Sequence, residues 1–308
     1  MQYIFSRQWH DVRAYAAENG VSVLGDVPMF VAHNSADCWA HQDQFDLDDR
    51  GNPSAVAGVP PDYFSADGQL WGNPLYDYQA MTKDNYQWWT DRFRRMMDLV
   101  DEIRVDHFRG FAAYWAVPAG SETAKSGAWK EGPGLDLFQA VYQKIGSLRL
   151  VAEDLGVITD DICTLKDAMH LPGMKVIQFH LKDRADGRLD FDTEPDCVAY
   201  TGTHDNNTIR GWYEEDLTPS QQLHVRQMLG LSDEAAPQEI AAALIAYTCR
   251  RRAETVIIPM QDLLALPSSG RMNTPGVAEG NWHWQLQDGQ LTFDIARWLA
   301  KVCRESGR

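Results

Sequence analysis

The sequence has few cysteines, no long hydrophobic run and a shortage of positive charge. Its five cysteines are an odd number and none belongs to a CxxC pair, so we predict neither a disulfide framework nor a metal site of the zinc type. No apolar run approaches the roughly eighteen residues that a membrane helix needs. The first seven residues (MQYIFSR) also lack the basic-then-apolar pattern of a signal peptide. These absences favour a reducing, cytoplasmic location.

The charge balance excludes several kinds of partner. With 28 basic and 44 acidic residues, the formal net charge is −16. A phosphate backbone or an anionic membrane surface would be repelled, so we expect neither nucleic acid nor membrane as a partner. Eleven residues each of tryptophan, tyrosine and phenylalanine are ample for stacking against uncharged rings such as sugars. Composition does not indicate the oligomeric state.

Strand and helix patterns alternate along most of the chain. Such alternation predicts a largely parallel sheet, either doubly wound or closed as a (β/α)8 barrel. In a barrel the chemistry gathers where strands finish, and four of the six predicted strands finish on or next to an acidic residue, which favours the TIM-barrel type. A capping box at 218–221 (TPSQ) further predicts a helix over 219–229. The six predicted strands end near Asp26, Asp106, Glu153, Phe179, Thr203 and Pro259.

The predicted barrel is incomplete. Closure needs eight strands, and the chain opens with a helix, predicted over 7–19, that should itself follow a strand. We therefore expect about six of eight strands in one catalytic domain, 1–308, truncated at its N-terminus. Long stretches without periodicity predict loop and helical insertions, which are usually functional in a compact domain. The predicted insertions lie at about 31–83, 111–134 and 206–254.

The stretch 102–110 (EIRVDHFRG) puts several chemically active side chains at the end of a short predicted strand. Ile103 and Val105 alternate as in a strand, which stops on Asp106 and is followed by an imidazole, an aromatic ring and a guanidinium. Because strand side chains alternate, Arg104 and Asp106 project to one face, where the cation favours an ionised carboxylate. Asp106 is thus a candidate nucleophile. A salt bridge that caps a core strand is the alternative.

Two more carboxylates follow other predicted strands. Glu153 ends an apolar strand, and we expect partial desolvation and the neighbouring Asp154 to raise its pKa towards that of a general acid. Asp205 lies among polar neighbours and would hold substrate hydroxyls. Three carboxylates at the ends of different strands can meet in a barrel, and they would provide the nucleophile and the acid/base of a retaining glycosidase. A capped strand end stays the alternative for each.

Seven sequence blocks occur in a fixed order between about residues 5 and 284. They are 25–31 (GDVPMFV), 58–65 (GVPPDYFS), 68–76 (GQLWGNPLY), 104–111 (RVDHFRGF), 152–156 (AEDLG), 202–206 (GTHDN), and 271–276 (RMNTPG) with 280–284 (GNWHW). Together they resemble the 4-alpha-glucanotransferases, also called amylomaltases or disproportionating enzymes, of glycoside hydrolase family 77. The blocks are long and specific, so chance agreement does not explain them.

The resemblance implies a role for each candidate residue. It implies Asp106 as nucleophile, Glu153 as acid/base and Asp205 as transition-state stabiliser. The donor glucose site would be lined by Asp26, Arg104, His107 and His204. A glucan-binding loop over the cleft would carry Tyr63, Phe64, Gln69 and Trp71. Without the resemblance, two alternatives remain. The two histidines could be structural residues, and the aromatic residues could anchor the loop to the barrel surface instead of binding a sugar.

The resemblance also implies a reaction. Segments of α-1,4-glucans, such as maltooligosaccharides, would move from a donor to the 4-hydroxyl of an acceptor glucan or glucose. The sequence itself has no Walker loop, no dinucleotide fingerprint after a strand and no HExxH, so we expect no cofactor and no metal. Family members begin well before Met1 of this chain, in keeping with the missing strands. Three alternatives therefore stay open: an inactive glucan-binding remnant, an unstable fragment without function, and a hydrolase of the α-glucosidase type.

Overall fold

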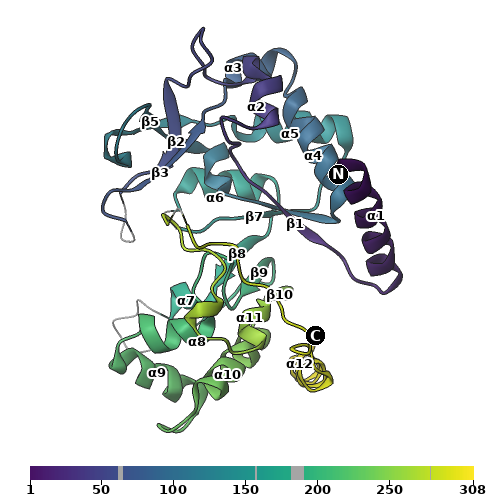
Figure 1. Cartoon of the computed structure of the whole chain (residues 1–308), viewed down its shortest axis with the longest axis vertical. Helices are drawn as coiled ribbons and strands as arrows, with labels where there is room; N and C mark the ends of the chain where they lie inside the picture. Colours follow the sequence, from purple (N-terminus) through teal and green to yellow (C-terminus); the bar gives the residue numbers. More distant parts are fainter. Residues whose placement is uncertain (62–64, 157, 182–190, 278) are drawn as a thin grey trace. The chain divides into compact units, whose positions relative to one another are not determined.

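The computed structural model describes residues 1–61, 65–156, 158–181, 191–277 and 279–308 (Figure 1). The chain divides into two compact units, Met1–Gly173 and Met174–Arg308, and each has its own hydrophobic core. Within the described ranges, no helix is both long and apolar enough to cross a bilayer.

The first unit contains a three-stranded parallel sheet of order β1-β4-β7. Its strands are β1 (Leu24–Val27), β4 (Glu102–Val105) and β7 (Leu150–Ala152). The register pairs Val105 with Ala152, the last residues of β4 and β7. Because parallel strands end at the same edge of a sheet, the two residues that follow, Asp106 and Glu153, emerge side by side.

Four helices belong to this unit, and three of them contribute to its core. They are α4 (Gln87–Leu99), α5 (Gly134–Ile145) and α6 (Asp160–Ala168), whereas α1 (Gln2–Glu18) has no buried residue. Trp89 and Phe93 of α4 and Phe138 of α5 are fully buried, and α4 packs against β1, β4 and α5. The first helix begins at Gln2, earlier than predicted, and the indole of Trp9 donates to the carbonyl of Leu99 at 2.7 Å.

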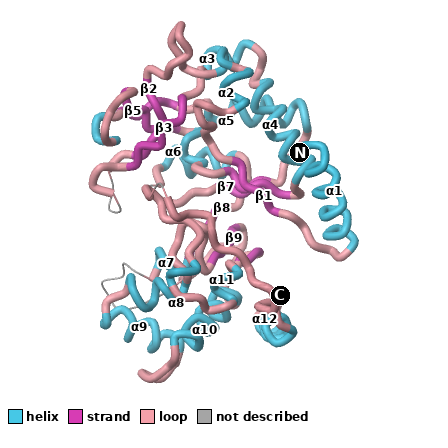
Figure 2. Tube along the Cα trace, in the orientation of Figure 1, coloured by secondary structure: helices cyan, strands magenta, loops and turns pink. Residues whose placement is uncertain are grey.

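The first unit also holds a second sheet, which is antiparallel and has the order β3-β2-β5-β6. Its strands β2, β3 and β5 are labelled in Figure 2. Its strands are β2 (Ala55–Val59), β3 (Gln69–Pro74), β5 (Ala113–Pro118) and β6 (Ala128–Glu131), and the short helices α2 (Ala36–Ala40) and α3 (Tyr78–Lys83) accompany it. The prediction of loops without strands over 31–83 and 111–134 was therefore wrong. The pairing is long-range, with Val56 opposite Val117, and glycines and prolines hide the strand periodicity in the sequence.

The second unit contains a three-stranded sheet of order β10-β9-β8, in which β9 and β10 are parallel. Its strands are β8 (Gly173–Val176), β9 (Cys197–Tyr200) and β10 (Thr255–Ile257). The strand predicted to end near Phe179 ends at Val176, where the short helix α7 (Ile177–His180) begins. In this helix the buried side chain of Gln178 donates to two backbone carbonyls of another segment, which an extended strand would not allow in the same place.

Helical segments of this unit contribute to the second core. They are α8 (Ile209–Gly211), a π turn at Trp212–Asp216, α9 (Pro219–Leu229) and α10 (Pro237–Cys249). The unit also contains α11 (Met260–Leu263) and α12 (Phe293–Glu305), and Val302 of α12 packs in a separate small cluster with α10. The predicted helix over 219–229 is confirmed, with Thr218 and Gln221 forming the capping box. Trp212, Val225 and Leu244 are buried in the core.

Candidate active site

Arg104 joins two carboxylates at the end of the parallel sheet of the first unit. It lies opposite Asp26 in the register, and its Nη1 donates to Asp26 Oδ1 at 2.8 Å, to Asp26 Oδ2 at 2.6 Å and to Asp106 Oδ1 at 2.9 Å. Arg104 is buried, whereas both carboxylates reach solvent. Burial opposes its charge, but Asp26 and Asp106 outweigh burial and raise the pKa of Arg104 above its ordinary value. The predicted contact between Arg104 and Asp106 is confirmed.

Glu153 is held at the same edge by backbone amides. Its Oε2 accepts from the amide of His107 at 2.8 Å, and its Oε1 accepts from the amide of Leu155 at 3.3 Å. His107 has a φ of 47°, in the left-handed region, which is uncommon for a residue other than glycine. This conformation directs the amide of His107 at the carboxyl group of Glu153, and such conformations often occur at functional sites.

The environment of Glu153 favours its protonated form. Burial, and after it the negative charge of Asp106, raise the pKa of Glu153 to about 8, against opposing contributions from Arg104 and the two amides. The predicted direction and the predicted effect of desolvation are confirmed, but the prediction that Asp154 contributes was wrong. The carboxylate of Asp154 is instead paired with Lys166 at 2.8 Å. The charge that raises the pKa comes from the neighbouring strand instead.

His107 and Trp71 lie next to these carboxylates. Their ring centroids are 4.8 Å apart in an edge-to-face arrangement, and the indole of Trp71 donates to Oε1 of Gln69 at 3.1 Å. Burial lowers the pKa of His107 to about 4, so the imidazole is neutral at pH 7 and can both donate and accept a hydrogen bond. Trp71 is 38 % exposed, which leaves part of its ring open for a ligand. The other two members of the predicted loop site, Tyr63 and Phe64, lie outside the described residues.

His204 and Asp205 belong to the second unit, in the turn after β9. The side chain of Asn206 accepts from the amide of Thr203 at 2.9 Å and from its hydroxyl at 2.8 Å, which closes the turn. His204 Nε2 is 3.4 Å from Asp205 Oδ2. The predicted site residues thus form two groups: Asp26, Gln69, Trp71, Arg104, Asp106, His107 and Glu153 in the first unit, and His204 and Asp205 in the second.

Two residues that contact Asp205 had no role in the sequence analysis. The side-chain Nδ2 of Asn273 donates to Asp205 Oδ1 at 2.6 Å, and Nη2 of Arg271 donates to the backbone carbonyl of Asp205, also at 2.6 Å. The backbone N–H of Asn273 donates to the backbone carbonyl of His204 at 3.0 Å. Both residues belong to the block 271–276, so the motif was visible in the sequence, but their partner more than sixty residues away was not.

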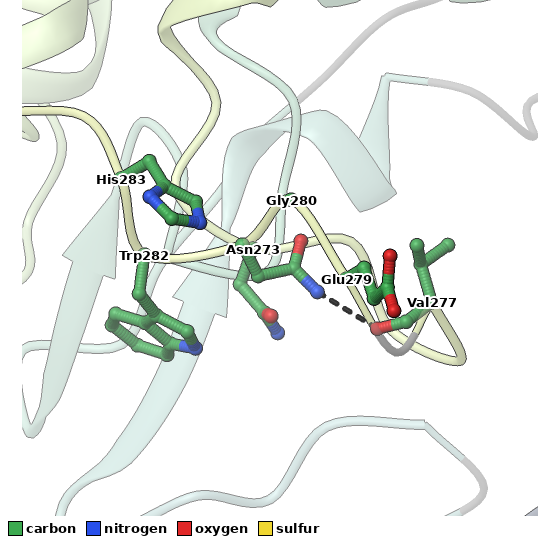
Figure 3. A pocket seen from close by; sticks show the side chains of 7 residues that line it. Asn273, Val277, Glu279, Gly280, Trp282 and His283 are labelled. Carbon is green, nitrogen blue, oxygen red and sulfur yellow. Dashed lines mark hydrogen bonds between the residues drawn. The ribbon is translucent and has the colours of Figure 1, made fainter.

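A pocket of about 620 Å³ opens in the second unit beside these residues (Figure 3). Its lining comes from Asn273, Val277 and residues 279–283. It adjoins the turn with Asp205, because Asn273 lines the pocket and donates to the carboxylate of Asp205. The ring of Trp282, which also lines the pocket, lies 5.2 Å from that of His204. A hydrogen bond of 2.8 Å from the side-chain amide of Asn281 to the carbonyl of Val277 shapes its wall. An indole, an amide and an imidazole around one hollow are side chains of the kind that bind sugars.

Within the part of the chain that the structure describes, no three histidine, cysteine, aspartate or glutamate side chains are grouped to hold a metal ion. The first group of residues offers two carboxyl groups in different surroundings: Asp106 is hydrogen-bonded to the guanidinium of Arg104, and Glu153 has a raised pKa. Such a pair can serve as nucleophile and proton donor.

Comparison with known proteins identifies the family. The sequence profile described as 4-alpha-glucanotransferase, of glycoside hydrolase family 77, matches residues 1–292. The chain is 48 % identical over 294 residues to the chloroplastic/amyloplastic 4-alpha-glucanotransferase of Arabidopsis thaliana, covering 95 % of this chain and 50 % of that protein. It is 41 % identical over 292 residues to the 4-alpha-glucanotransferase of Streptococcus pneumoniae, covering 94 % of this chain and 57 % of the relative.

Solved structures agree with this assignment. Amylomaltase from Streptococcus agalactiae, determined in complex with acarbose, superposes with a TM-score of 0.94 at 34 % identity, covering 100 % of this chain and 62 % of that one. Amylomaltase from Corynebacterium glutamicum has a TM-score of 0.81 at 17 % identity, over 98 % of this chain and 49 % of the other, which supports the α/β fold alone. The chain spans about half the length of the plant relative. The chain belongs to the 4-alpha-glucanotransferase family, glycoside hydrolase family 77.

Proposed function

We propose that this chain transfers segments of α-1,4-glucans from a donor to the 4-hydroxyl of an acceptor glucan or of glucose, with retention at the anomeric carbon. Family membership supports the type of reaction. The complex of the amylomaltase of Streptococcus agalactiae with acarbose, an oligosaccharide analogue, supports maltooligosaccharides as ligands. A hydrolase of the α-glucosidase type is the nearest alternative reaction.

One observation carries the proposal: Asp106 and Glu153 follow neighbouring parallel strands, and Asp106 accepts a hydrogen bond from Arg104 while burial raises the pKa of Glu153. In the first step, an oxygen of Asp106 attacks C1 of the donor glucose while Glu153 gives its proton to the departing oxygen. In the second, Glu153 takes the proton of the acceptor 4-hydroxyl, whose oxygen attacks C1 and releases Asp106. The contact of 2.9 Å from Arg104 to Asp106 supports the nucleophile, and the pKa of about 8 supports Glu153 as the acid.

The remaining predicted residues are proposed to bind substrate or to stabilise the transition state. Asp205 would stabilise the positive charge that develops at C1. A fixed position is supported by the hydrogen bond that its carboxylate accepts from Asn273 and by the one that its backbone N–H donates to the hydroxyl of Thr203. Asp26, Arg104, His107 and His204 are the proposed contacts of the donor glucose.

Acceptor binding is proposed to decide between transfer and hydrolysis. Trp71 is partly exposed and lies against His107, which suits a ring that stacks on an incoming sugar and excludes water. Gln69 orients Trp71 by a hydrogen bond, and Tyr63 is proposed as a further contact of the same loop.

We also propose that the six strands belong to one (β/α)8-type barrel domain, with insertions at about 31–83, 111–134 and 206–254. The parallel pairing of β1, β4 and β7, and of β9 and β10, supports this arrangement. A cytoplasmic location stays a prediction, since the plant relatives are named chloroplastic/amyloplastic.

Incubation with maltotriose tests the proposed reaction. We expect a ladder of longer maltooligosaccharides together with glucose, because the glycosyl-enzyme passes its sugar to another glucan rather than to water. The products are separated by chromatography, with the Asp106→Asn variant as the control for contaminating activity. Glucose and maltose alone would indicate a hydrolase. Binding of maltooligosaccharides without any product would indicate an inactive remnant, and aggregation without a cooperative melting transition an unstable fragment.

A further inference from the structure

Two buried polar side chains of the second unit form hydrogen bonds on both sides of the turn that carries His204 and Asp205. These are Gln178 of α7 and Asp262 of α11, which are 3 % and 2 % exposed. Neither is part of the proposed chemistry, and neither belongs to the sequence blocks of the family resemblance. Both contact the backbone or side chains of the segment 201–209, which contains the turn.

Asp262 joins the first and last residues of this segment. Its Oδ2 accepts from the hydroxyl of Thr201 at 2.7 Å, and its Oδ1 accepts from the amide of Ile209 at 2.8 Å. Thr201 directly follows β9, and Ile209 begins α8. One carboxylate therefore fixes the distance between the end of the strand and the start of the helix.

Gln178 makes a second bridge over the same segment. Its Nε2 donates to the carbonyl of Thr201 and to the carbonyl of Asn207, both at 3.0 Å. A Cβ at Gly202 would lie only 2.8 Å from this nitrogen, so the absence of a side chain at Gly202 allows the close approach. Both donor hydrogens of the amide are thus directed at the backbone on either side of Asp205.

Burying the carboxylate of Asp262 costs free energy, because a charged group loses its hydration. Burial raises its pKa to about 6, although the hydrogen bonds from Thr201 and Ile209 oppose this shift. Within the described ranges, none of the ion pairs includes Asp262. Unpaired buried carboxylates are retained where their acceptor geometry is needed, since a well-packed apolar residue is often at least as stabilising.

We propose that Asp262 and Gln178 are positioning residues, which hold the turn at 203–206 so that the carboxylate of Asp205 keeps a fixed place. The proposal rests on the proposed role of Asp205 in the reaction. Between the two bridges the turn is closed by its own hydrogen bonds, from Thr203 to Asn206, and by Asn273 on Asp205. Loss of either bridge frees an end of the segment, and a shift of about 1 Å can lower a rate about a hundredfold.

Hydrogen exchange measured by mass spectrometry tests the positioning without reference to activity. In Asp262→Ala and in Gln178→Met, amides of peptides that cover 203–208 should exchange at least about tenfold faster than in the wild type, because the opening free energy of the segment falls. Asp262→Asn keeps an acceptor oxygen for Ile209 and should restore most of the protection. Thr193→Val is the matched control, since Thr193 is 1 % exposed and its hydroxyl accepts from Ala253, outside the segment.

Kinetics with maltotriose complete the test. Both bridge variants should lower kcat by about tenfold or more with KM changed less than about threefold, while Thr193→Val lowers the melting temperature but leaves kcat unchanged. Unchanged exchange over 203–208, or faster exchange with an unchanged kcat, would overturn the proposal. If Asp262→Ala does not fold, fast exchange will extend over the whole chain. The exchange and kinetics of Gln178→Met and Asp262→Asn then test the proposal.

Asp205→Asn, measured in parallel, separates the two proposals. If it retains full transfer, the proposed role of Asp205 fails while the exchange data still decide whether the turn is held by Asp262 and Gln178. If Asp205→Asn loses transfer but the bridge variants do not, the positioning role fails and the proposed function stands.

Discussion

Asp106→Asn should lower the rate of transfer from maltotriose by about four orders of magnitude or more, the largest loss we expect from any single substitution. The amide has the shape of the carboxylate but is a poor nucleophile, so the bond to C1 cannot form. The fold should persist, because Arg104 keeps both of its hydrogen bonds to Asp26. Rates are measured by product chromatography at pH 7, and the fold by a urea titration.

Asp101→Asn is the matched control for that substitution. Asp101 lies just before β4, accepts from Arg13 at 2.5 Å and from the amide of Val23 at 2.8 Å, and is remote from the carboxylates at the other end of the strand. The substitution Asp101→Asn should lower the free energy of unfolding but leave the transfer rate within about twofold of the wild type. Substantial turnover by Asp106→Asn would remove the nucleophile from the proposed mechanism.

Glu153→Gln should produce the second largest loss, about a thousandfold with maltotriose, because the departing sugar oxygen no longer receives a proton. An α-glucosyl fluoride donor tests the reason, since fluoride departs without protonation. With this donor the first step should remain within about tenfold of the wild type. If both donors lose activity equally, Glu153 does not act as the proton donor.

The same residue predicts the response to pH. The acid must be protonated at the start, so with maltotriose the rate should fall as pH rises through about 8, the pKa of Glu153, and the fluoride donor should not show this fall. The raised pKa also links folding to pH. Because the folded state holds this proton more tightly than an unfolded chain, the contribution of Glu153 to the free energy of unfolding is complete below about 4.5 and is lost as pH rises through about 8.

The parts of the fold that local pattern decides were predictable from the sequence. The six strands of the two three-stranded sheets were located because each lies in a short apolar run, and β4, β7 and β9 are followed directly by polar residues. The capping box located α9 to the residue. The antiparallel sheet was not predicted, because β2 and β5 pair across about sixty residues and neither shows a clear alternation of apolar and polar residues.

In the candidate site, too, contacts between residues distant in the sequence were not predicted. Asp154 is adjacent to Glu153 in sequence, yet the charge that raises the pKa of Glu153 belongs to Asp106, at the end of the neighbouring strand. Sequence adjacency along a strand places side chains on opposite faces, whereas register places distant residues together. Gln178 and Asp262 were invisible for the same reason, because their partners in the segment 201–209 come from other elements.

Trapping the covalent intermediate tests the central claim most directly. A fluorinated α-glucosyl fluoride, whose ring fluorine slows the second step, should leave one sugar bound to the enzyme. Trypsin would release the peptide 105–109 (VDHFR), in which Asp106 is the only acidic side chain. We predict that mass spectrometry finds the sugar on this peptide. A sugar on the peptide with Glu153 or Asp205, or no labelled peptide from an enzyme that consumes the fluoride, would contradict the account.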